Sequence, residues 1–110
     1  MKIMLLIVIT LSIPVHATVE IIAGPYVQNV GNDCATIMWK TNIKTEKNVV
    51  YWGNSYKLIN KTVAYENTEW HEVKLDGLKP LTTYFYKVKS DKIESRIHSF
   101  TTSGNCKNLL

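Results

Sequence analysis

The sequence predicts an all-β protein in which seven strands form a two-sheet sandwich. Segments with strand character recur about every 8–12 residues, and polar or Gly-containing turns separate them. Apolar and polar residues alternate cleanly within two of these segments, 35–40 and 83–88, as expected when one face of a strand is buried. Helical periodicity is hard to find after residue 17. The chain has 110 residues, a length that suits one domain.

The strands are expected in order at 26–30, 34–41, 48–53, 62–65, 70–75, 83–89 and 94–101. Turn clusters and a polar loop over 42–47 separate them, and these contain Gly, Asn, Asp and Ser. In the second strand we expect Ala35, Ile37 and Trp39 to point inward. The third strand has apolar residues on both faces, and we interpret Val50 and Trp52 as its inward pair. In the fifth strand, alternation places His71 inside and Trp70 outside.

The sixth strand begins with a pattern typical of a tyrosine corner. Gly77 and Pro80 mark a turn, and Tyr84 follows Pro80 at the start of the strand. In a tyrosine corner the ring packs into the sandwich and its hydroxyl bonds backbone a few residues upstream. The competing interpretation is an ordinary Tyr-rich strand after a proline turn. The expected structural residues are therefore Trp39, Pro80, Tyr84, Tyr86 and Val88.

The first 17 residues have the features of a secretory signal peptide. Lys2 supplies a positive charge, an apolar run follows, and small residues lead to an expected cleavage site after Ala17. We therefore expect a secreted or extracytoplasmic protein with a domain at 18–102 and a tail or truncated linker at 103–110. Retention of the segment as a membrane anchor is the alternative. Apart from this segment, no membrane partner is expected.

Two further features concern covalent chemistry. Cys34 and Cys106 are the only cysteines, and in an exported protein such a pair is more often a disulfide than two free thiols. In a seven-stranded sandwich both would lie near one pole, so a bridge is possible. Asn60 begins an Asn-Lys-Thr triplet, which is an N-glycosylation acceptor only in a eukaryotic host.

The charge pattern argues against a nucleic-acid partner. The net charge is +4, but the lysines are scattered along the sequence and Arg96 is the only arginine. A nucleic-acid-binding domain gathers its cations on one face and favours Arg for bidentate phosphate contacts. We interpret the lysines as a solvated surface.

Several segments, taken in order, resemble one known family. Gly24–Gln28 and Ala35–Thr41 are similar to the opening of purple acid phosphatases, which are secreted metallophosphoesterases. The similarity continues through 50–53, 71–75, 77–80, 83–88 and 100–102, so it covers about 24–102. The resemblance implies the small fibronectin type III or immunoglobulin-like sandwich that precedes the catalytic domain in that family. Leu81 departs from the pattern, because the family usually has Gly after the proline, and the turn is expected to differ slightly here.

The resemblance implies a fold and a usual neighbour rather than an activity. The family builds its dinuclear metal centre in the following domain, from motifs such as Gly-Asn-His, and no position of this chain matches them. A two-metal site needs several converging ligands, and His71 and His98 are too few for it. We therefore expect no catalytic residue, no metal ligand and no cofactor in this chain.

Three functions remain to be compared. The favoured hypothesis is a non-catalytic N-terminal module that packs on a metallophosphoesterase catalytic domain, in cis or in trans. The alternative is a freestanding exported module that binds a protein or a glycan, with Trp70 as the binding-surface candidate. Catalysis by this chain alone is rejected on the residues above.

Overall fold

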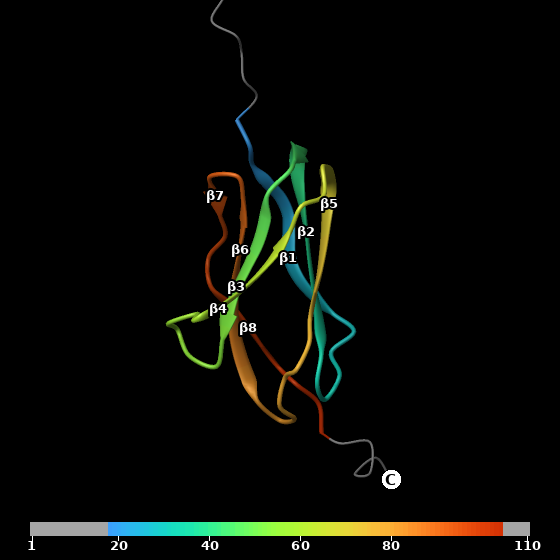
Figure 1. Ribbon diagram of the computed structural model, residues 1–110, viewed down its shortest axis with the longest axis vertical. Coiled ribbons are helices and arrows are strands. Elements are labelled where there is room, and N and C mark those ends of the chain that lie inside the picture. The colour runs from blue at the N-terminus through green and yellow to red at the C-terminus, as the bar shows by residue number, and fades with distance from the viewer. Residues whose placement is uncertain (1–17, 105–110) are drawn as a thin grey trace, which may run out of the picture.

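The computed structural model describes residues 18–104, and these form two antiparallel β-sheets packed face to face, with no helix among them (Figure 1). The first sheet has the strand order β1-β2-β5 and the second has the order β4-β3-β6-β7, with β8 also paired to β6. The strands are β1 Ile21–Gln28, β2 Ala35–Thr45, β3 Asn48–Gly53, β4 Asn60–Ala64, β5 Thr68–Leu75, β6 Thr83–Ser90, β7 Ile93–Glu94 and β8 His98–Thr101. The predicted sandwich is confirmed. No helix in the described range is long and apolar enough to cross a membrane.

The structure has eight strands because the last predicted strand is interrupted. Ser95 leaves the regular ladder: its backbone N–H donates to Val88 O, and its Oγ accepts from the Val88 N–H, both at 2.9 Å. A side-chain oxygen thus takes the place of a backbone carbonyl, and the segment 95–97 separates β7 from β8. The expected single strand over 94–101 is therefore two short ones.

Two other strand boundaries differ from the prediction by more than two residues. β1 begins at Ile21 rather than at 26, and it carries two register shifts against β2 between Ile21 and Tyr26. β2 continues to Thr45, through most of the segment 42–47 that its polarity marked as a loop. The polar side chain of Asn42 is paired with the segment before β1, because it accepts from Glu20 N–H and donates to Thr18 O, each at 2.8 Å.

The core lies between the sheets and is centred on Trp39. Trp39, Ala35 and Ile37 are fully buried from β2, and Val50 is fully buried from β3, as alternation predicted. Trp52 also lies inward but is only partly buried, with its ring edge-on to Tyr84. The remaining buried apolar residues of this cluster are Val73, Leu75, Leu78, Tyr84, Tyr86, Val88 and Phe100.

A chain of buried hydrogen bonds joins the two sheets beside this core. Trp39 Nε1 donates to Ser90 Oγ, which donates to Asn48 Oδ1, both at 2.8 Å. Thr45 Oγ donates to the same Asn48 oxygen at 2.6 Å and also lies 3.2 Å from His71 Nε2. Every member of this chain is at most 2% exposed, so each bond satisfies a group that water does not reach.

From its burial and its hydrogen-bond partners we assign His71 as a neutral imidazole with its proton on Nε2. Thr41 Oγ lies 2.9 Å from His71 Nε2 and donates its own proton to Ile43 O at 2.7 Å. Because the hydroxyl protons of both Thr41 and Thr45 are directed at other acceptors, the imidazole nitrogen must be the donor. Burial lowers the pKa of His71, and the charge of Asp91 opposes this effect only in part. The imidazole ring packs on Trp39, with centroids 5.0 Å apart.

The turn before β6 has the hydrogen bonds of a tyrosine corner. The backbone N–H of Lys79 donates to the Tyr84 hydroxyl at 2.8 Å. Thr102 Oγ donates to Lys79 O and accepts from Thr82 N–H, so the residue that follows β8 closes the same turn. Leu81 lies at φ +49° and is 72% exposed. Leu81 therefore adopts a left-handed backbone conformation at the position where the family pattern has Gly.

Candidate interaction surfaces

The outer face of the first sheet carries the exposed aromatic residue that the sequence singled out. Lys40 of β2 is paired with Trp70 of β5, and Met38 is paired with Glu72 on one side and Tyr26 on the other. Directly paired residues of antiparallel strands point to the same side of the sheet. We call this set of five residues the aromatic face. Trp70 is 52% exposed and Tyr26 is 50% exposed.

Lysine and tryptophan are in contact on the aromatic face. Lys40 Nζ lies 5.3 Å from the centroid of the Trp70 ring, within range of a cation–π interaction. This contact holds the ammonium against the ring and fixes the orientation of both side chains. The aromatic face therefore offers two large rings and a methionine, with Glu72 as its acidic group.

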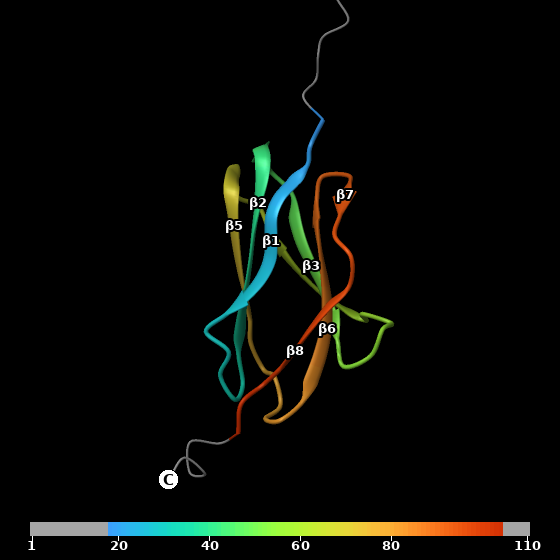
Figure 2. The ribbon, with the colours of Figure 1, turned by 180° about the vertical axis from the view of Figure 1, so that it is seen from behind.

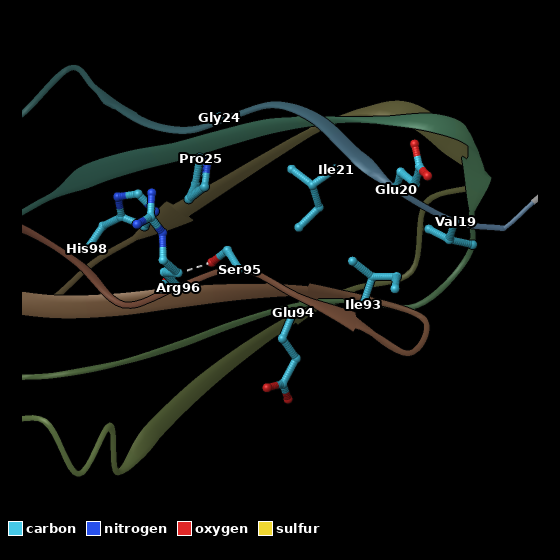
Figure 3. Close-up of a pocket in the computed structure, with 10 residues that line it drawn as sticks. All are labelled: Val19, Glu20, Ile21, Gly24, Pro25, Ile93, Glu94, Ser95, Arg96 and His98. Atoms are coloured by element: carbon cyan, nitrogen blue, oxygen red, sulfur yellow. Dashed lines mark hydrogen bonds between the residues drawn. The ribbon is translucent and has the colours of Figure 1, made fainter.

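A groove of about 440 Å³ lies between β1 and the β7–β8 segment (Figure 3). Figure 2 shows these strands at the neighbouring edges of the two sheets. Arg96 and His98 lie beside each other at one end, next to Pro25, and Glu20 lies at the other end (Figure 3). Ile21 and Ile93 line the wall between them. The groove thus places a cation and a carboxylate at opposite ends of an apolar strip.

The groove does not contain an activated nucleophile. Ser95 lines the groove and carries a hydroxyl that could in principle act as a nucleophile. Its Oγ donates to Arg96 O at 2.8 Å and accepts from the Val88 N–H. Both functions of this hydroxyl are therefore engaged with backbone. A serine nucleophile instead needs a base within hydrogen-bond reach of its proton.

The histidines and acids of the described residues do not converge on a metal. No group of three His, Cys, Asp or Glu side chains among residues 18–104 is placed to hold an ion. His71 is in the buried network described above, and His98 is in the groove. The ligand set of a dinuclear centre therefore does not fit the residues in this part of the chain.

The residues predicted for covalent modification lie partly inside and partly outside the described range. Cys34 is half-buried next to Gly31, and Gly31 O accepts a hydrogen bond from Ser103 N–H at 3.0 Å. This hydrogen bond holds the segment that leads to Cys106 near Cys34. Cys106 itself lies outside the described residues. Asn60 is exposed at the start of β4. The signal segment 1–17 and most of the tail also lie outside the described range.

The strand pairing brings together lysines that looked scattered in the sequence. Lys61 of β4 and Lys87 of β6 are both paired with Tyr51 of β3, and Lys89 lies two positions beyond Lys87. All four therefore point to the outer side of the second sheet. Sequence alternation alone places Lys87 and Lys89 on one face. The juxtaposition with Lys61 depends on the strand order β4-β3-β6, which no local pattern reveals.

With the fold and surfaces described, the family can be decided by comparison. A family model described as "Purple acid Phosphatase, N-terminal domain" matches residues 24–102, which include every strand except the start of β1. The chain belongs to this family. The purple acid phosphatase N-terminal domain is the non-catalytic N-terminal part of an acid phosphatase family. No characterised protein sequence gives a significant match.

Solved structures agree on the fold of this N-terminal domain. PhoD aligns with a TM-score of 0.63 at 13% identity over 72% of this chain, and the chain spans 18% of PhoD. The sensor domain of the anti-sigma factor RsgI4 of Pseudobacteroides cellulosolvens aligns at 0.60 and 18% identity, covering 79% of this chain and 96% of that one. A computationally redesigned β-sandwich protein aligns at 0.54 and 21% identity over 72% of this chain and 89% of its own. At these identities the likeness concerns the fold.

Proposed function

We propose that this chain is the non-catalytic N-terminal module of a purple acid phosphatase-like metallophosphoesterase and that it packs on a catalytic domain, in cis or in trans. The observation that carries the proposal is the family match over 24–102. The chain spans 18% of PhoD, which fits a small non-catalytic module that accompanies a larger catalytic part. The metal centre and its chemistry would belong to the partner domain, and this chain would supply a rigid sandwich beside it.

The aromatic face is the surface best suited to this contact. Protein interfaces are enriched in Trp, Tyr and Met and depleted in Lys and Glu. The aromatic face has two half-exposed rings and a methionine beside one lysine and one glutamate, whereas the outer side of the second sheet carries three lysines around one tyrosine. Trp70 would be its main energetic contributor, because truncation of a central Trp commonly weakens binding by about 2 kcal/mol or more.

The test is a titration with a purple acid phosphatase catalytic domain from the same genome. We expect a complex by calorimetry and by size-exclusion chromatography with light scattering. Trp70→Ala should weaken it at least about tenfold. Ile59→Ala is the matched control, since this apolar side chain is 77% exposed but lies in the loop before β4 on the other sheet. No complex with wild-type protein, or equal loss in the two variants, would contradict the proposal.

Export is a separate part of the proposal. The signal pattern at 1–17 would direct the chain out of the cytoplasm, and cleavage after Ala17 would leave Thr18 as the first residue. N-terminal sequencing of protein recovered from outside the cytoplasm tests this step. A product that still begins at Met1 would instead indicate a retained anchor or no processing.

A freestanding module is the second candidate. It is favoured by the RsgI4 sensor domain, 96% of which aligns with this chain, because that sandwich is a domain of an anti-sigma factor. Under this alternative Trp70 would bind a protein or a glycan without any phosphoesterase. Quenching of the tryptophan fluorescence by neutral oligosaccharides that is lost in Trp70→Ala, together with no binding to the catalytic domain, would favour it.

A further inference from the structure

The outer side of the second sheet carries a row of lysines around one tyrosine. Tyr51 is flanked directly by Lys61 on β4 and by Lys87 on β6, and Lys89 follows on the same side of β6. We call Tyr51 and these three lysines the lysine face. Neighbouring strands lie about 4.8 Å apart, so the backbones of Lys61 and Lys87 are separated by roughly 10 Å.

The positive charge of the lysine face is only partly neutralised within the fold. Lys87 Nζ forms an ion pair with Glu94 at 3.2 Å. Among the described residues, Lys61 and Lys89 form no ion pair. Like charges held close together on a rigid sheet repel one another, and a ligand with several negative groups relieves this repulsion.

An exposed aromatic ring lies at one end of the same surface. Phe85 is two positions before Lys87 and points to the same side, and Tyr56 packs on it with ring centroids 4.4 Å apart. Tyr56 is 71% exposed, so the outward side of its ring is open to solvent. In contrast, Lys87 Nζ lies over the Tyr51 ring at 5.5 Å from its centroid and occupies that position.

We propose that the lysine face, together with Tyr56, binds an anionic polysaccharide. Carboxylate or sulfate groups along the polymer would pair with Lys61, Lys87 and Lys89. The apolar face of a sugar ring would lie on Tyr56.

Two other kinds of partner fit this surface less well. A protein partner is disfavoured because lysines are depleted from interface cores. A single-stranded nucleic acid stacks successive bases on open rings, and Lys87 already lies over Tyr51, which leaves Tyr56 as the ring open for stacking. The phosphate-reading residue of choice is Arg, and Arg96 lines the groove rather than this surface.

The experiment uses soluble polygalacturonate as the probe, measured by affinity electrophoresis and calorimetry, with neutral dextran and a single-stranded oligonucleotide as comparison ligands. The test variant is Lys61→Gln with Lys89→Gln. Its matched control is Lys44→Gln with Lys74→Gln, which removes the same charge from β2 and β5 of the other sheet. Thermal unfolding by circular dichroism verifies that both variants fold.

We expect polygalacturonate binding that weakens with added salt and no dextran binding. The test variant should lose about tenfold in affinity, and the control less than about twofold. Tyr56→Ala should weaken binding without changing the salt dependence. Equal losses in the two double variants would reduce the effect to net charge and overturn the proposal. It would also be overturned by equal binding of dextran, or by tighter binding of the oligonucleotide.

Discussion

Replacing Leu81 by glycine should stabilise the protein, although glycine usually destabilises an ordered chain. Leu81 lies at φ +49°, where its Cβ crowds the following carbonyl oxygen and costs about 1–2 kcal/mol. Glycine removes this cost but loses roughly 0.5–1 kcal/mol more conformational entropy on folding. The side chain is 72% exposed, so its own burial contributes little.

Leu81→Ala is the control that isolates the backbone effect, because alanine also loses the leucine side chain but keeps Cβ. We expect the glycine variant to be about 0.5–1 kcal/mol more stable than the alanine variant, which corresponds to a Tm difference of about 2–8 °C. Urea unfolding followed by the fluorescence of buried Trp39 measures the free energy. If the alanine variant is the more stable of the two, the strain argument is refuted.

Three further predictions use other contacts. Tyr84→Phe should cost about 1–2 kcal/mol by urea unfolding, because it removes the acceptor of the 2.8 Å bond in the corner; a change near zero would mean the bond contributes nothing. Burial lowers the pKa of His71, so stability should be complete above about pH 6.5 and fall as the pH drops below it, by at most about 1.4 kcal/mol per unit. His71→Gln should flatten this slope in pH-dependent unfolding, and an unchanged slope, or the same flattening in His98→Gln, would contradict it. For protein purified from an oxidising compartment, mass spectrometry after alkylation should show Cys34 and Cys106 linked, and reduction should cost roughly 4 kcal/mol; two alkylated thiols before reduction would refute the bridge.

The alternation of side chains was enough to predict most of the strands and their buried faces. Ala35, Ile37 and Trp39 alternate with more polar residues, and such a period of two indicates a β-strand with one buried face. The same argument placed His71 in the core, since it occupies an inward position of a strand. The buried imidazole of His71 is hydrogen-bonded by two threonine hydroxyls of the neighbouring strand β2.

Strand ends were harder to predict, because they depend on individual hydrogen bonds. Asn42 and Thr45 look like loop residues, yet Asn42 bonds the segment just before β1 and Thr45 bonds Asn48 of β3. Ser95 ends β7 with a side-chain oxygen, which no hydrophobic pattern records. The lysine face was not predicted for a different reason. Lys61 and Lys87 lie close together only because β3 separates β4 from β6 in the sheet.

The way the two sheets end along the groove limits what can associate with the protein there. Pro25 lacks an amide hydrogen, β1 shifts its register against β2 twice between Ile21 and Tyr26, and β7 has only two residues. An incoming polypeptide would find no continuous row of free backbone groups to extend either sheet. Recognition along this seam must therefore depend on side-chain chemistry, and copies of the molecule have no template here for joining edge to edge into fibrils.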